Sequence, residues 1–219
     1  MTQFLRIGAA ILLMSSCGAK LPPYGGEKES ALATATMAVD VGAVTRLLGA
    51  GADPNKMVPV NGNRQSAWFL ALYLLRPARP EMVPIIKAML NAGANPNDVW
   101  GTMTDVQAPP ESFWHRFTHH ARTAGTGMFS TFDVLMVNAA PQADVVRALT
   151  AAHARPQLAE SLLVSSIESG DADVAHVLVD AGVDVNCRPG ANTPLLAAIE
   201  ARDVPMMTYL EEHGAREKP

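Results

Sequence analysis

The sequence predicts an all-α solenoid of about five helix-turn-helix repeats. The first observation is a phrase that recurs at residues 47–55, 89–97 and 178–186, and in shortened form at 210–215. In the three full copies, apolar residues precede a Gly, and Asp or Asn follows two and four residues later. The second observation is the composition, because 48% hydrophobic residues in a chain of 219 exclude collagen-like and polar disordered proteins. Self-similarity of this kind indicates a repeat architecture.

Each repeat is expected to open with a hydroxyl residue that caps its first helix. Ser30, Ser66, Ser161 and Thr193 occupy this place, each followed by an apolar segment. Gly near the end of the repeat supplies the left-handed residue that ends the second helix. A fifth copy has His153 where the others have Gly. Asp-Pro-Asn and its variants then predict a turn toward the next repeat.

These residues carry a resemblance to a known family. The segment Thr193-Pro194-Leu195-Leu196-Ala197-Ala198, together with the recurring Gly phrase, is similar to the opening and period of ankyrin repeats. The resemblance covers roughly residues 30–216, within a predicted ankyrin-repeat domain of residues 30–219, and implies stacked helical hairpins that bind proteins. Another helical-hairpin solenoid is the alternative.

The N-terminus is predicted to be a targeting segment. Residues 1–16 have a short charged start and an apolar run, which is typical of a secretory signal peptide. The run Leu13-Met14-Ser15-Ser16-Cys17 resembles a bacterial lipoprotein lipobox, with Met14 as the departure from the usual Leu. The resemblance implies lipidation at Cys17, with residues 17–29 as lipidated Cys and flexible tether. An ordinary cytosolic first helix is the alternative to any targeting segment.

The predicted anchor sets the expected location. Gly18 follows the cysteine where an inner-membrane retention signal would have Asp. The resemblance therefore implies the periplasmic face of the bacterial outer membrane. A plain secretory peptide, which would leave the chain soluble in the periplasm, is the other possibility.

Extra residues lie in and after the second repeat. The spacing from Gly51 to Gly93 is 42 residues, and that from Gly93 to His153 is 60. Against a period of about 33 residues, this predicts a lengthened second repeat and an insertion at about 99–128, between repeats 2 and 3. The insertion is rich in aromatic residues and His.

The insertion and neighbouring turns supply candidate partner contacts, because Trp, Phe and Arg are the usual anchors of interfaces. The candidates are Met57, Val58, Arg64, Trp100, Phe113, Trp114, Arg116, Phe117 and Arg188. The alternative is that the aromatic residues of the insertion pack on the third repeat while its histidines lie in solvent.

Motifs for catalysis and metal binding are weak or absent in the sequence. Glu111, His115 and His119 share one face of a predicted helix, but no Cys or second carboxylate completes a metal site. No nucleophile elbow, zinc-protease motif or phosphate-binding loop occurs. We therefore expect no enzyme activity, cofactor or small-molecule substrate. A formal net charge of -4 gives no basic field for nucleic acid.

Together, these features predict a lipid-anchored module that binds a protein partner. Its sharper form is an immunity protein that blocks a secreted antibacterial effector, such as a type VI phospholipase-like toxin, because small ankyrin lipoproteins resemble such guards. The alternative is a helper of a periplasmic enzyme such as a catalase, in which the histidines handle haem or metal.

Overall fold

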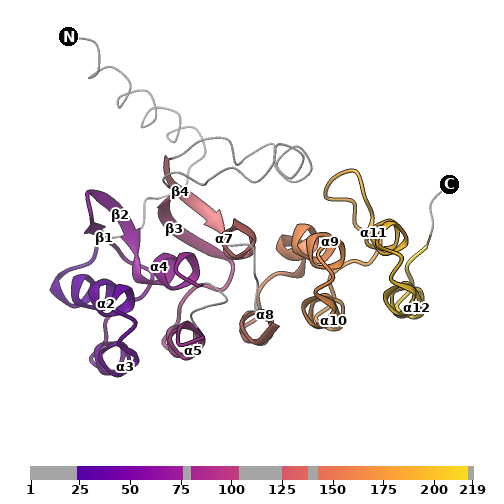
Figure 1. Ribbon diagram of the computed structural model, residues 1–219. Coiled ribbons are helices and arrows are strands. Elements are labelled where there is room, and N and C mark those ends of the chain that lie inside the picture. The colour runs from indigo at the N-terminus through magenta and orange to yellow at the C-terminus, as the bar shows by residue number, and fades with distance from the viewer. Residues whose placement is uncertain (1–23, 76–79, 104–124, 138–142, 217–219) are drawn as a thin grey trace, which may run out of the picture.

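The computed structural model describes residues 24–75, 80–103, 125–137 and 143–216. Helix pairs follow one another in a row, with the first helices in one layer and the second helices in another (Figure 1). Within the described residues the pairs are α2 (Glu27–Met37) with α3 (Val41–Gly49), α4 (Ala67–Tyr73) with α5 (Met82–Asn91), α7 (Thr131–Val137) with α8 (Ala143–Ala151), α9 (Glu160–Glu168) with α10 (Ala172–Asp180), and α11 (Pro194–Ala201) with α12 (Val204–Glu212). The short 3-10 helix η1 (Pro156–Ala159) leads into α9.

Two β-hairpins correct the expectation of an all-α chain. Strand β1 (Met57–Val60) pairs antiparallel with β2 (Asn63–Ser66), and β3 (Asp98–Met103) pairs antiparallel with β4 (Gly125–Ser130). Asn61 and Gly62 join the first two strands with φ of 49° and 80°. Positive φ at both central residues matches the twist of the flanking strands, so Asn-Gly closes a two-residue hairpin here. The chain is mostly helical, with both hairpins on the side of the first helices (Figure 1).

Two of the predicted helix caps are present. The Ser66 hydroxyl accepts a hydrogen bond from the Phe69 N–H at 3.0 Å at the start of α4. The Thr193 hydroxyl accepts from the Leu196 N–H at 3.2 Å at the start of α11, where Pro194 occupies the first turn. Each bond satisfies a donor that the first helical turn leaves unpaired.

The other two predicted caps, Ser30 and Ser161, are wrong because both residues lie inside helices. Helix α2 begins at Glu27, so the predicted tether cannot extend to residue 29. Helix α9 begins at Glu160, directly after η1, so Ser161 is the second residue of the helix and does not precede it.

The ends of the second helices follow the predicted rule. Gly51, Gly93, Gly182 and Gly214 have φ between 84° and 90°, the left-handed region that glycine adopts without steric cost. His153 takes the same conformation at φ 62° in the copy that lacks glycine. The recurring phrase in the sequence therefore marks the same backbone turn in each of these places.

Neighbouring helix pairs bury one continuous core. The position seven residues before the left-handed residue is fully buried in the first four pairs, as Val44, Ile86, Val146 and Ala175. Its counterpart in the last described pair, Met207, is only half-buried. Each pair therefore depends on the next one for burial of its apolar face. None of the described helices is long and apolar enough to cross a membrane.

Asparagine side chains join the turns of successive pairs. The Asn55 Oδ1 accepts the Asn95 N–H at 2.8 Å, and the Asn55 amide donates to the Gly93 carbonyl at 2.9 Å. In the next turn, Asn97 Oδ1 accepts the Arg155 N–H at 2.7 Å. These bonds satisfy backbone groups that the ends of the second helices leave open. We call this set of bonds the asparagine ladder.

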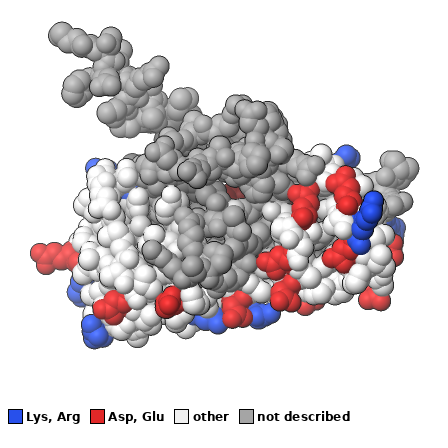
Figure 2. All heavy atoms as spheres, in the orientation of Figure 1, with Lys and Arg blue, Asp and Glu red and all other residues white. Residues whose placement is uncertain are grey.

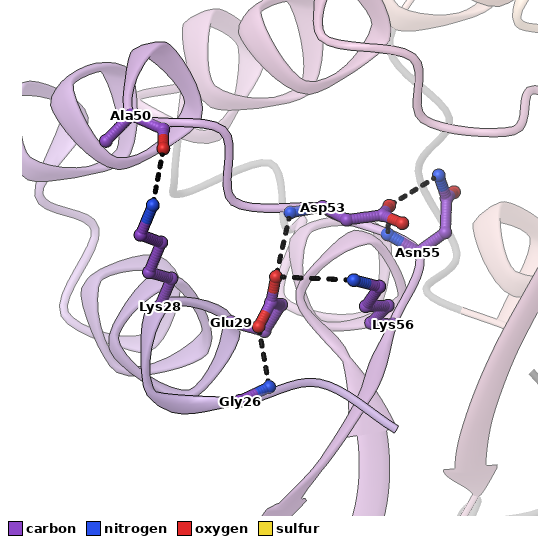
Figure 3. A network of polar contacts seen from close by, with 7 residues as sticks. All are labelled: Gly26, Lys28, Glu29, Ala50, Asp53, Asn55 and Lys56. Atoms are coloured by element: carbon purple, nitrogen blue, oxygen red, sulfur yellow. Dashed lines mark hydrogen bonds and ion pairs between the residues drawn. The ribbon is translucent and has the colours of Figure 1, made fainter. Parts of the chain in front are cut away.

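Glu29 takes the place of the asparagine at the start of the ladder (Figure 3). Its buried carboxylate accepts the Asp53 N–H at 3.4 Å and the Gly26 N–H at 2.6 Å, and Lys56 lies 3.8 Å away. The hydrogen bond from the Gly26 N–H lowers the pKa of Glu29 below its usual value, against the opposing effect of burial. The first turn is thus held by a charged group of α2.

The asparagine ladder is interrupted at the third turn and continues at the last one. Asn186 Oδ1 accepts the Arg216 N–H at 3.0 Å, and its amide donates to the Gly214 carbonyl at 3.1 Å. The equivalent residue of the third turn is Gln157, which is exposed. Among the described residues, no hydrogen bond joins Gln157 to the N–H of Asp184, the matching position of the next turn.

Replacing Asn55 with alanine is expected to destabilise the fold by about 0.5–1.5 kcal/mol, because the Asn95 N–H and the Gly93 carbonyl, which are exposed, lose their side-chain partner to water. Urea unfolding followed by circular dichroism measures the change. The matched control is Asn91→Ala, an exposed asparagine at the end of α5, which should change the free energy of unfolding by less than about 0.5 kcal/mol. Equal effects of the two substitutions would contradict a role for the ladder.

Glu29→Gln is expected to lower the free energy of unfolding by about 1–3 kcal/mol at pH 7, because a hydrogen bond to a charged group is lost. Since the pKa is lower in the folded state, the carboxylate stabilises the fold above the pKa of the unfolded chain, and this contribution is lost as the pH falls through the folded value.

Urea unfolding of both proteins from pH 7 to pH 3 tests this expectation. The difference in free energy of unfolding between wild type and Glu29→Gln should become smaller below about pH 4.3, the ordinary pKa of a glutamate. Glu27→Gln, in the same helical turn, is the control and should change the free energy of unfolding at pH 7 by less than about 0.5 kcal/mol. A difference between wild type and Glu29→Gln that stays constant with pH would show that the charge is not what holds the turn.

Candidate functional site

The two hairpins lie against each other on one edge of the stack. Strands β2 and β3 are in contact, and the Ser66 hydroxyl donates a hydrogen bond to the Trp100 carbonyl at 2.9 Å. We call this surface, formed by the hairpins 57–66, 98–103 and 125–130, the finger edge. Figure 1 shows it beside the first helices and away from the second helices.

The second hairpin is seated closely on helix α4. A Cβ atom at Gly101 would lie 2.2 Å from the ring of Phe69, so only glycine allows β3 to approach this closely. The Phe69 ring stacks on Tyr73 with centroids 5.4 Å apart, and Phe129 of β4 lies 6.2 Å from it. The described base of the insertion is therefore anchored in the hydrophobic core.

A hollow of about 340 Å³ lies between the hairpins. It is lined by Asn55, Ser66, Trp68, Asn95, Asp98, Val99 and Trp100. Trp68 is fully buried, and its indole N–H donates to the Asn95 carbonyl at 2.8 Å. Trp100 is half-buried, so part of its indole faces the outside. We call this feature the inter-finger hollow.

One ion pair stands at the rim of the hollow. The Asp98 carboxylate lies 3.5 Å from the guanidinium of Arg155, and both side chains are partly exposed. The pair joins the start of β3 to the turn before η1, which are far apart in sequence. Water screens such a pair, so its contribution to stability is small.

Arg64, a predicted partner contact, is exposed on β2 and already has a neighbour. Its guanidinium lies 4.7 Å from the centre of the Tyr24 ring, and it also donates a hydrogen bond to the Tyr24 hydroxyl. Tyr24 is 57% exposed. An arginine held over an aromatic ring loses less side-chain freedom when it binds a partner.

Met57 and Val58, predicted as partner contacts, are buried, with 3% and 1% of their surface exposed. Strand β1 packs on α2, and the Gly25 N–H donates to the Met57 carbonyl at 3.0 Å. Their side chains are therefore part of the core and do not lie on the outer surface of the finger. The pairing of β1 with β2 and the packing of β1 on α2 explain why these two predicted contact residues are buried.

Arg188 lies at a different place from Trp100. It is exposed, donates to the Ala191 carbonyl at 3.3 Å, and lines a second hollow of about 230 Å³ beside α11. Leu196, which is 39% exposed, lines the same hollow. The predicted partner residues are thus divided between two separate hollows.

Several predicted site residues lie outside the described part of the chain. They are the lipidation residue Cys17, the partner candidates Phe113, Trp114, Arg116 and Phe117, and the metal candidates Glu111, His115 and His119. Within the described ranges, no three His, Cys, Asp or Glu side chains gather in a way that could hold a metal ion.

Cys187 is a buried thiol, 5% exposed. Burial raises its pKa to about 12, and the nearby carboxylates of Glu160 and Asp184 act in the same direction. The reactive form of a cysteine is the thiolate, so this environment makes the side chain inert at neutral pH.

Charge is unevenly distributed along the stack. Residues 143–216 contain eleven Asp or Glu against five Arg and no Lys. Figure 2 shows acidic side chains gathered over the end of the molecule that carries α9 to α12. This end therefore presents a negative surface, which favours approach of a basic partner.

Comparison with known proteins identifies the fold. The crystal structure of EF0377, an ankyrin repeat protein, is similar with a TM-score of 0.55 and 19% sequence identity, and the match covers 85% of this chain and 82% of that one. No family model matches the sequence, and no curated protein does. The chain has an ankyrin-repeat fold, as the resemblance in the sequence predicted.

Gly101→Ala is expected to force β3 away from Phe69 and to destabilise the protein by about 1–3 kcal/mol, the usual cost of overpacking a core. Thermal unfolding gives the stability, and Trp fluorescence reports the environment of the neighbouring Trp100. Gly49→Ala is the control, because a Cβ there meets no atom within 4 Å and alanine favours the helix. If Gly101→Ala left both readouts unchanged, the close seating of the hairpin would be wrong.

Proposed function

We propose that this chain is a non-enzymatic binding module that contacts a protein partner through its finger edge. The observation that carries the proposal is the inter-finger hollow, where two hairpins held by Ser66 and Gly101 present Trp100 and Asp98 beside each other. The ankyrin-repeat fold supports a protein partner in general.

The finger edge is suited to binding because its shape is fixed before a partner arrives. Phe69 packs against Gly101 of β3 and Phe129 of β4, and Trp68 binds the Asn95 carbonyl in the turn before β3. Tyr24 holds the exposed Arg64 on β2. Rigid presentation of Trp and Arg side chains lowers the entropy lost on association. Side chains of these two types also contribute most strongly to known interfaces.

The sharper form of the proposal is an immunity protein. The chain would be held by a lipid on Cys17 at the periplasmic face of the outer membrane, or lie soluble in the periplasm, and would cover the active-site entrance of a secreted antibacterial effector such as a type VI phospholipase-like toxin. The lipobox-like residues 13–17 and the ankyrin-repeat fold support this form. The acidic surface over α9 to α12 suits a basic toxin.

A housekeeping role is the second candidate, as a scaffold or helper of a periplasmic enzyme such as a catalase. His115, His119 and His120 in the insertion favour it, because imidazole binds haem iron and zinc. A Soret band or stoichiometric zinc in the purified protein would support this role, and a colourless, metal-free preparation would count against it.

The test is affinity capture from periplasmic extract with a soluble Cys17→Ser form, followed by mass spectrometry. The proposal expects a secreted effector enzyme whose activity falls on binding. Trp100→Ala bait should bind it at least about tenfold more weakly, as for an interface anchor. The control bait is Val204→Ala, an apolar side chain exposed on α12, which should bind normally.

The outcomes separate the parts of the proposal. If only resident envelope proteins are recovered, the immunity role is contradicted and the scaffold role is supported. Capture of a partner that Trp100→Ala and Val204→Ala bind equally would show that the finger edge is not the contact surface.

A further inference from the structure

We infer that the inter-finger hollow is a binding site for one cationic side chain of the partner, with arginine as the preferred ligand. This inference rests on the proposed function, since it assigns the chemistry of the same surface. Most polar lining groups are already hydrogen-bonded, Asp98 and Trp100 are accessible, and Arg155 already binds Asp98 at the rim.

Most polar groups of the hollow are already used. The Ser66 hydroxyl donates to the Trp100 carbonyl, and the Trp68 indole N–H donates to the Asn95 carbonyl. Asn55 binds both Asn95 and Gly93 through its side chain. Among the described lining residues, the groups that remain accessible to a ligand are the Asp98 carboxylate, which pairs only with the exposed Arg155, the half-buried Trp100, and the side-chain amide nitrogen of Asn95.

A carboxylate beside an indole selects a planar cation. A guanidinium stacks on Trp more favourably than on other side chains and at the same time donates hydrogen bonds to a carboxylate. Among the described lining residues there is no Lys or Arg, and the nearest described cation is Arg155 at the rim. An anionic ligand would meet the charge of Asp98, and an apolar one would strip water from that carboxylate without replacing it.

The hollow is large enough to accept a single side chain. Its volume of about 340 Å³ lies at the lower end of the range of about 300–1,000 Å³ for small-molecule pockets. Strand β3 and Ser66 of β2 line it together with Asn55 and Asn95 of two turns, and the fully buried Trp68 of α4 also contributes to the lining. A side chain that projects from a protein surface fits such a site.

Arg155 shows that Asp98 accepts a guanidinium, and it competes with the partner. Its backbone N–H is held by Asn97 at 2.7 Å, so its side chain starts from a fixed point near the rim. The guanidinium reaches Asp98 at 3.5 Å but does not line the hollow. This pair is loose and exposed, so a partner arginine that also contacts Trp100 would displace it.

The probe for the test is the peptide acetyl-Gly-Arg-Gly-amide, with its citrulline counterpart as the uncharged analogue of the same shape. Two-dimensional NMR of the full chain carrying Cys17→Ser follows the indole N–H of Trp100 and the side-chain amide of Asn95 during titration. The arginine peptide should shift these signals saturably. The citrulline peptide should bind at least about tenfold more weakly, as expected on loss of a charge-assisted pair.

Two substitutions should act in opposite directions. Asp98→Asn should weaken binding of the arginine peptide about tenfold, and Arg155→Gln should strengthen it by about threefold because the competing cation is gone. The matched control is Asp144→Asn, which breaks the exposed Asp144–Arg147 pair on α8 and should leave binding unchanged. Circular dichroism of each variant verifies that it is folded.

The result that would overturn the inference is equal binding of both peptides, or unchanged affinity in Asp98→Asn when the variant is folded. Failure of the proposed function is a separate outcome. If the arginine peptide binds saturably and depends on Asp98 but no protein is captured, the cation site is supported and the proposed protein partner is contradicted. If a captured partner binds the Asp98→Asn variant as tightly as wild type, the protein partner is supported and the cation site is contradicted.

Discussion

Side chains that reach from one turn to the backbone of the next hold this stack in register. Asn55, Asn97 and Asn186 each accept an N–H of the following turn, and Glu29 does the same for the first. The apolar faces of the helices supply most of the burial, but apolar contact alone has no direction. The ladder supplies the direction, because a hydrogen bond forms only within a narrow range of distances and angles.

The candidate site depends on the same bonds. Asn55 and Asn95 belong both to the ladder and to the lining of the inter-finger hollow, so the distance between the hairpins follows the spacing of the turns. The interruption at Gln157 falls where η1 replaces a hairpin before α9. The proposed binding site therefore lies before the interruption, and the acidic surface lies beyond it.

The sequence predicted the repeated elements well and the contacts between distant residues poorly. Four glycines and His153 end second helices as expected, because a left-handed residue is a local requirement of the backbone. The hairpin at Asn61-Gly62 also has a local signal, because Asn-Gly favours a two-residue turn between strands. Pairs such as Asp98 with Arg155 have no such signal, since the packing of the whole chain brings them together.

Hydrogen exchange of single backbone amides tests the ladder most directly. The account predicts strong protection at the N–H groups of Asn95, Arg155 and Arg216, which have side-chain acceptors, and fast exchange at Asp184, which faces the interruption. Equal protection at all four amides would contradict the account. It would show that helix packing alone sets the register of the stack.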